Sequence, residues 1–99
     1  MKIEHKHNLP IDVTYTRINK LLHELQDQYS DKISDPHKRW NSSHTQMDFS
    51  IEIMGFKTYG QIYLKKHLVI LEGKLPFMAI IFSGKIESMI KEKFDELLS

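Results

Sequence analysis

The sequence predicts an α+β fold in which two helices cover one face of an antiparallel sheet, in the order β-α-β-β-β-β-α. Three observations indicate this fold: helical periodicity in the first third, alternating apolar and polar residues over 37–73, and a second helical stretch after Pro76. A chain of 99 residues is close to the commonest size of one domain. We therefore expect residues 1–99 to form a single domain.

The first strand and the first helix are predicted before residue 36. Residues 3–7 alternate as a short, half-exposed strand does, and Pro10 ends this pattern. Apolar residues then recur at helical spacing after Thr14, at Ile18, Leu21, Leu22, Leu25, Tyr29 and Ile33. Pro36 disfavours helical backbone at Asp35, so the helix is expected to end there.

Residues 37–73 predict four strands of an antiparallel meander, including a short strand around Trp40. Turns are expected at 54–56 and at 65–67, and the segment 68–71 is apolar on both faces. The last helix is predicted to open at Pro76 and to run to about Leu98. Steps of 100° place one apolar stripe along it, consisting of Ala79, Phe82, Ile86, Met89, Ile90 and Leu97.

The composition argues against several classes of function. The chain contains fourteen Lys and Arg and thirteen Asp and Glu, so its charge is nearly balanced. It lacks the basic cluster that nucleic-acid binding usually requires. The absence of cysteine excludes disulfides, thiolate catalysis and Cys-containing zinc sites. The N-terminus shows no apolar signal sequence, and no apolar run approaches the roughly 20 residues of a transmembrane helix. A cytoplasmic protein is therefore expected.

Three groups of residues resemble catalytic or metal-binding motifs, but each has a simpler interpretation. His5 and His7 have a spacing found in metal sites, but without further ligands nearby we interpret them as an exposed strand face. Gly55 and Gly60 lack the Lys-Ser/Thr of a phosphate loop and are expected to frame a tight turn. The third group, carboxylates expected to be solvated on the polar side of the sheet, consists of Asp48, Glu52 and Glu72. We predict neither an enzyme nor a cofactor.

The start of the last helix carries more apolar side chains than its core stripe requires. Phe77, Ile80 and Ile81 fall on the opposite or flanking side. Such a segment is either covered within the chain, here by the N-terminal strand or a loop, or it meets a partner. The partner would be a second copy of the chain, a nonpolar small molecule or a lipid-like polymer surface.

The C-terminal motifs resemble those of the polyhydroxyalkanoic acid system proteins. The matching blocks are Leu75-Pro76-Phe77, Phe82-x-Gly84-Lys85-Ile86-Glu87-x-x-Ile90 and Asp95-Glu96-Leu97-Leu98, and looser matches run in the same order along nearly the whole chain. This resemblance implies a small protein that is associated with polyhydroxyalkanoate granules or regulates them, and it brings no catalytic residues. The predicted order also looks like a trimmed helix-grip fold, a class that holds hydrophobic ligands.

Three functional hypotheses follow. The first is a non-enzymatic accessory protein that binds the granule through Phe77, Ile80 and Ile81. The second is a carrier of a small hydrophobic ligand, with a cavity between helices and sheet lined by Phe49, Ile62, Leu71 and Phe82. The third is a structural homodimer that buries the apolar start of the last helix at a two-fold interface.

Overall fold

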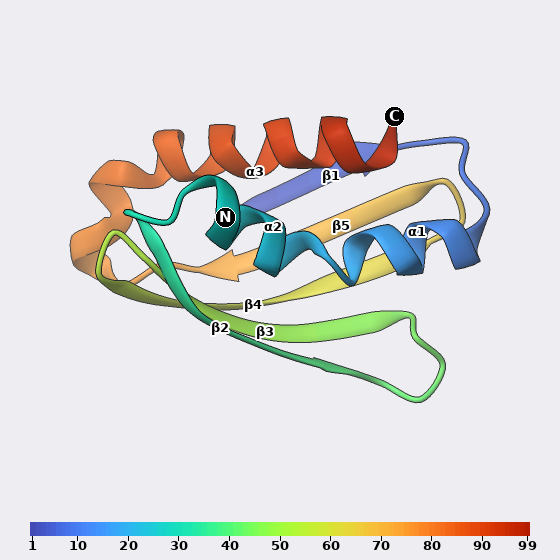
Figure 1. The fold of residues 1–99 in the computed structure, drawn as a ribbon, viewed down its shortest axis with the longest axis horizontal. Helices are drawn as coiled ribbons and strands as arrows, with labels where there is room; N and C mark the ends of the chain where they lie inside the picture. Colours follow the sequence, from blue (N-terminus) through green and yellow to red (C-terminus); the bar gives the residue numbers. More distant parts are fainter.

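Five antiparallel strands form one sheet in the computed structural model, which describes all 99 residues (Figure 1). The strands are β1 (Lys2–Lys6), β2 (Ile33–Trp40), β3 (Gln46–Ile53), β4 (Phe56–Lys65) and β5 (Leu68–Lys74). Their spatial order is β1-β5-β4-β3-β2, so β2 to β5 form a meander. The first strand joins the sheet at the free edge of β5, with Lys2 opposite Glu72. An edge position was expected for this strand.

The helices lie together on one face of the sheet and leave its other face open (Figure 1). They are α1 (Ile11–Ile18), α2 (Leu21–Gln28) and α3 (Ser83–Leu98), and a 3₁₀-helix, η1 (Phe77–Phe82), precedes α3. This arrangement confirms the α+β class and the order of elements that the sequence predicts. Between the helices and the sheet lies one core, and twenty buried apolar residues form it.

The first helical segment is divided, whereas the sequence predicts one continuous helix. The break lies at Asn19, where the Lys20 N–H bonds the Arg17 carbonyl at 3.1 Å in a tighter turn. Two side chains of β2 hold the break: the Trp40 Nε1–H donates to Asn19 Oδ1 at 2.8 Å, and the Lys38 ammonium donates to the Asn19 carbonyl. These partners are about 20 residues away in the sequence, so helical periodicity carries no sign of them.

The predicted end of the first helix is also wrong. Helix α2 ends at Gln28, and Ile33 belongs to β2, where it pairs with Ile53. Pro36 lies within β2 at a shift of register between Ser34 and His37, not at a helix terminus. Since β2 is an edge strand, a residue without an N–H is tolerated there, and the bulge discourages pairing with other chains.

The prediction of a tight turn framed by two glycines holds for only one of them. Gly55 has a φ of +83° in the turn between β3 and β4, a backbone region that glycine adopts readily. Gly60 instead lies inside β4, where an added Cβ would approach the Glu72 carbonyl oxygen to 2.3 Å and Phe49 Cζ to 2.7 Å. The missing side chain makes room for the Phe49 ring on the neighbouring strand.

The predicted apolar stripe of the last helix agrees with burial at every position except Phe82, but it omits part of the buried face of α3. The side chains of α3 that are buried against the core are Ile86, Met89, Ile90, Lys93, Phe94, Leu97 and Leu98. Phe82, which the stripe includes, is 37% exposed, whereas Phe94, which it omits, is fully buried. For Phe82 the cause is the 3₁₀ geometry of η1, because with three residues per turn, steps of 100° misplace its side chains. Phe94 lies in the regular helix four residues after Ile90, so helical spacing does predict its burial and the sequence-based stripe omitted it wrongly.

Candidate hydrophobic binding surface

The largest exposed apolar surface of the molecule lies on η1. The exposed fractions are 84% for Phe77, 68% for Met78, 53% for Ile80 and 81% for Ile81. Met78 belongs to this surface although the sequence analysis did not select it; its position within the apolar run 77–82 was the available signal. We call these four residues together with Phe82 the η1 surface. Single exposed apolar residues are ordinary, but so many within six positions form a contiguous patch.

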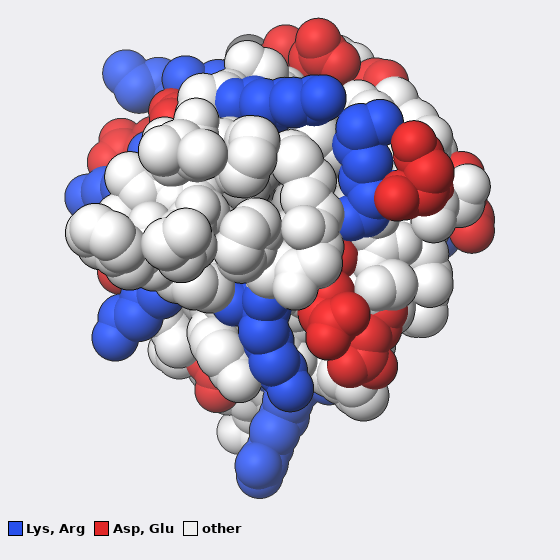
Figure 2. Space-filling model, turned by 90° about the vertical axis from the view of Figure 1, so that its left-hand side faces the viewer, with Lys and Arg blue, Asp and Glu red and all other residues white.

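The backbone of η1 explains why these side chains face outward. Pro76 opens the segment with extended backbone, and the Ala79 N–H bonds the Pro76 carbonyl at 2.8 Å. Ala79 is the only residue of η1 that is buried, so one small methyl group anchors the segment to the core. The remaining side chains are exposed, and η1 lies at the end of the molecule that Figure 2 faces.

No part of the chain covers the η1 surface, although the sequence left open that the N-terminal strand would. The N-terminus is tied to β5 instead: the Met1 ammonium donates to the Gly73 carbonyl at 3.1 Å, and the Gly73 N–H donates to the Met1 carbonyl at 2.9 Å. Between this end and η1 remains a hollow of about 590 Å³, on whose wall Ile80 lies. The intramolecular explanation is therefore wrong for Phe77 and Ile81.

Charged side chains border the η1 surface without interrupting it. Figure 2 shows a continuous uncharged area with Lys and Arg side chains at several points of its edge, and acidic side chains farther along one side. Two exposed lysines, Lys74 and Lys85, flank the segment in the sequence. Lys85 also contributes to lowering the pKa of Asp31, although the main cause of that shift is the hydrogen bond from Lys32.

The four residues predicted to line a ligand cavity are not gathered around one hollow. Phe49 and Leu71 touch a hollow of about 20 Å³ between α2, α3 and the sheet, whereas Ile62 and Phe82 do not line it. Ile62 is fully buried in the core, and the Phe82 ring lies 6.2 Å from the Phe56 ring at the start of β4. A hollow of this size has room for about one water molecule. Ligand binding here stays a prediction, and it would require the core to open.

His5 and His7 do not lie on an exposed strand face as the sequence suggested. Together with Ile3 they face the helices: His7 is 6% exposed, and the His5 ring lies 6.1 Å from the Phe94 ring of α3. His7 Nδ1 accepts a hydrogen bond from the Leu9 N–H at 3.1 Å, while its Nε2 is buried without a partner. Burial, with smaller contributions from His67 and His5, lowers the pKa of His7. No group of three or more possible metal ligands is present.

The three carboxylates singled out in the sequence do lie on the open face of the sheet. Asp48 and Glu72 occupy one row across the strands, separated by Gln61 of β4. Glu52 lies farther along β3, opposite Lys57 and within 3.3 Å of the Ser34 hydroxyl. The arrangement is that of solvated side chains on a polar sheet face, without a cleft around them.

Comparison of the chain with known proteins identifies one matching family. A family model described as polyhydroxyalkanoic acid system protein matches residues 1–98 of the chain. No curated protein and no solved structure matches it. No helix combines the length and apolar character that crossing a membrane requires. Since the match extends over nearly the whole sequence, the chain belongs to the family of polyhydroxyalkanoic acid system proteins.

Proposed function

We propose that this protein is a non-enzymatic accessory protein of polyhydroxyalkanoate metabolism. It works in the cytoplasm, where it attaches to the granule through the η1 surface as a structural or regulatory component. The observation that supports this is the exposure of Phe77 and Ile81, each more than four-fifths accessible in a chain that has nothing to cover them. A polyester particle offers the extended apolar surface on which such a segment can be buried. The family to which the chain belongs supplies the cellular setting.

The size of the η1 surface is sufficient for attachment. Moving a large apolar side chain from water to an apolar environment contributes roughly 1.5–3 kcal/mol. Phe77, Met78 and Ile81 are all at least two-thirds exposed, so their burial would contribute several kcal/mol. Because η1 continues directly into α3 and the Ser83 N–H bonds the Ile80 carbonyl, these side chains are carried on helical backbone before attachment, which keeps the entropic cost of attachment low.

Co-sedimentation of the purified protein with polyhydroxybutyrate granules tests this proposal. The variant Ile80→Ser/Ile81→Ser removes two large side chains of the η1 surface and should weaken attachment by roughly a hundredfold, since each lost side chain costs about 1.5 kcal/mol. Both positions are exposed, so thermal unfolding should show an unchanged fold.

A matched control distinguishes the η1 surface from exposed apolar side chains in general. Ile11 and Tyr59 are 48% and 52% exposed and lie outside η1, on α1 and on the open sheet face. The variant Ile11→Ser/Tyr59→Ser should attach as strongly as the unmodified protein. Equal attachment of all three proteins would refute the proposal. If the η1 variant instead turns a dimer into a monomer in sedimentation velocity, and granules bind neither form, the surface serves a homodimer.

A further inference from the structure

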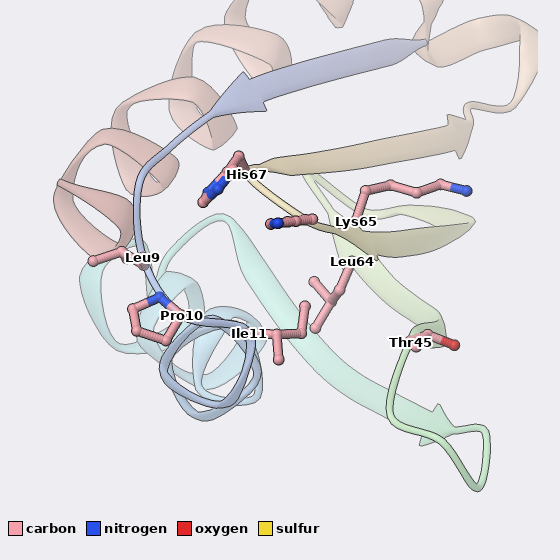
Figure 3. Close-up of a pocket in the computed structure, with 8 residues that line it drawn as sticks. Leu9, Pro10, Ile11, Thr45, Leu64, Lys65 and His67 are labelled. Carbon is pink, nitrogen blue, oxygen red and sulfur yellow. The ribbon is translucent and has the colours of Figure 1, made fainter.

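Another hollow lies at the opposite end of the molecule from η1. It has a volume of about 470 Å³ and is enclosed by the start of α1, the turn between β4 and β5, and Thr45 of the loop before β3 (Figure 3). We call it the α1 pocket. Its volume falls within the range of roughly 300–1,000 Å³ that is typical of small-molecule sites.

The inner wall of the α1 pocket is apolar, and the Ile11 side chain on it is only about half covered. Leu9, Pro10 and Ile11 form one side and Leu64 the other, and the Ile11 and Leu64 side chains point toward one another in Figure 3. Ile11 is 48% exposed, which makes it one of the few large apolar side chains outside η1 that remain accessible. Leu64 is only 4% exposed, so a hydrocarbon group placed in the pocket would mainly cover Ile11.

The mouth of the α1 pocket carries only groups that are basic or neutral. Lys65, Lys66 and His67 all come from the turn between β4 and β5, and no Asp or Glu lines the pocket. Figure 3 shows the Lys65 side chain directed away from the hollow, so Lys66 and His67 are the candidate hydrogen-bond donors at the mouth. Both are exposed and make no ion pair within the chain.

His7 connects the two walls of the α1 pocket from behind. Its N–H bonds the His67 carbonyl at 3.0 Å, and its Nδ1 accepts the Leu9 N–H at 3.1 Å. The segment that carries Leu9 is therefore fixed to the turn that carries His67. The backbone N–H of His7 holds the His67 side and its buried imidazole holds the Leu9 side, so one residue fixes both sides of the pocket before a ligand arrives, which favours binding.

We propose that the α1 pocket binds an aliphatic monocarboxylate. The hydrocarbon chain would lie between Ile11 and Leu64, and the carboxylate would meet Lys66 and His67 at the mouth. Apolar walls disfavour sugars and other polar ligands, while the basic mouth without acidic neighbours favours an anion over a neutral or cationic amphiphile. This proposal does not depend on the granule, because the pocket and the η1 surface share no residue.

Titration with octanoate, followed in ¹⁵N-¹H NMR spectra of the full chain, tests the proposal. Saturable shifts are expected at residues 9–11 and 64–67, with one ligand per chain. The neutral analogue octanamide should bind roughly tenfold more weakly, because it loses the charge-assisted hydrogen bonds. Absence of saturable binding, equal binding of octanamide, or shifts confined to η1 would each overturn the proposal.

Two variants locate the ligand. Lys66→Gln should weaken octanoate binding by roughly tenfold, whereas the same change at the exposed Lys20, outside the pocket, should leave it unchanged. Ile11→Ser should weaken binding by shortening the apolar wall. All three positions are exposed, so the NMR spectra of the free variants should remain those of the folded protein. If Lys66→Gln and Ile11→Ser both bind as the unmodified protein does, the pocket is not the site.

Discussion

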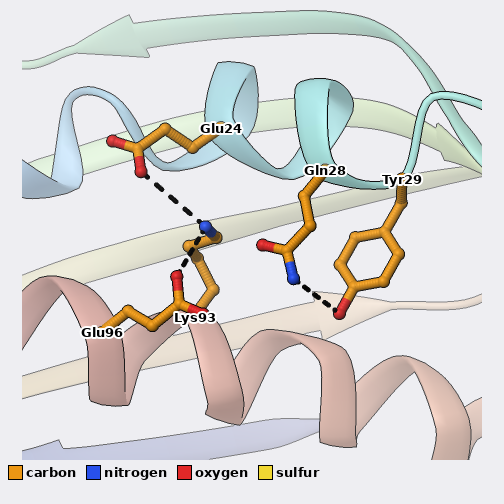
Figure 4. Close-up of polar contacts among 5 residues, drawn as sticks. All are labelled: Glu24, Gln28, Tyr29, Lys93 and Glu96. Atoms are coloured by element: carbon orange, nitrogen blue, oxygen red, sulfur yellow. Dashed lines mark hydrogen bonds and ion pairs between the residues drawn. The ribbon is translucent and has the colours of Figure 1, made fainter.

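The two parts of the last helical segment use their side chains in opposite ways. Along α3 the apolar side chains are buried, and even Lys93 is only 5% exposed, whereas in η1 every side chain except Ala79 faces outward. The Lys93 ammonium lies 2.8 Å from Glu96 Oε2 and 3.7 Å from Glu24 Oε1, between α3 and α2 (Figure 4). Near it, Gln28 donates to the Tyr29 hydroxyl at 3.3 Å.

This contrast separates residues that hold the fold from residues that are free to act. In α3, burial is so complete that a lysine is enclosed, and its ammonium is paired with carboxylates of α3 and α2. In η1, four large apolar side chains remain in water, so they contribute little burial energy to folding and can still contribute it to binding. A comparable composition therefore serves stability at one end of the segment and is available for binding at the other.

The largest expected effect concerns two phenylalanines of the same segment. Phe94 is fully buried, so Phe94→Ala should lower the free energy of unfolding by about 3–5 kcal/mol. Phe77 is 84% exposed, so Phe77→Ala should change it by less than about 0.5 kcal/mol. Urea unfolding followed by circular dichroism measures both values. Comparable losses in the two variants would show that the Phe77 side chain is packed in solution, and the difference between η1 and α3 would then not exist.

The core of the fold was predictable because it depends on local pattern. The periodicity of Leu21, Leu22 and Leu25 and the alternation of β3 identify the buried residues correctly, since burial repeats with the geometry of each element. Ile33 was misassigned because an apolar residue at helical spacing is indistinguishable from one that begins a strand. The break at Asn19 depends on Trp40, a contact that no local pattern encodes.

The candidate sites were predictable to different degrees. The apolar residues of the run 77–82 exceed what one helical stripe can bury, which indicates a surface that is covered either by another part of the chain or by a partner, and the sequence does not decide between the two. The α1 pocket was not predictable, because it joins residues 9–11 to 64–67 through the pairing of β1 with β5. The environment of His7 was predicted wrongly for a related reason: alternation shows that two faces exist, but only the position of α3 decides which one is covered.

The next largest effect is expected for the ion pairs of the buried Lys93 side chain in α3. The double variant Glu24→Gln/Glu96→Gln leaves the Lys93 ammonium enclosed without a carboxylate, and should cost about 3 kcal/mol of unfolding free energy. Lys93→Met keeps the packing of the stem and leaves two partly exposed carboxylates that water can solvate, so it should change stability by less than about 1 kcal/mol.

An exposed pair on the same helix provides the control for this asymmetry. Lys91 and Glu87 lie 3.1 Å apart with side chains 58% and 36% exposed, so Glu87→Gln should cost no more than about 0.5 kcal/mol. Chemical denaturation of the four proteins at one pH and ionic strength gives the comparison. If Lys93→Met were as damaging as the double variant, the ammonium would be a net source of stability rather than a charge that needs neutralising.

The smallest effect concerns His7, a buried polar residue directly after β1. Its pKa in the folded protein is lowered from 6.5, chiefly by burial, while the unfolded chain retains the ordinary value. Below pH 6.5 the unfolded state therefore binds a proton that the folded state does not, and stability falls with decreasing pH until the folded pKa is reached. Protonation also removes the Nδ1 acceptor of the Leu9 N–H.

The variant His7→Asn should therefore flatten the dependence of stability on pH between pH 7.5 and 5, whereas His23→Asn, at an exposed position of α2, should not. If the slope of stability against pH were unchanged in His7→Asn, other groups would cause the pH dependence, and the buried imidazole of His7 would not contribute to it.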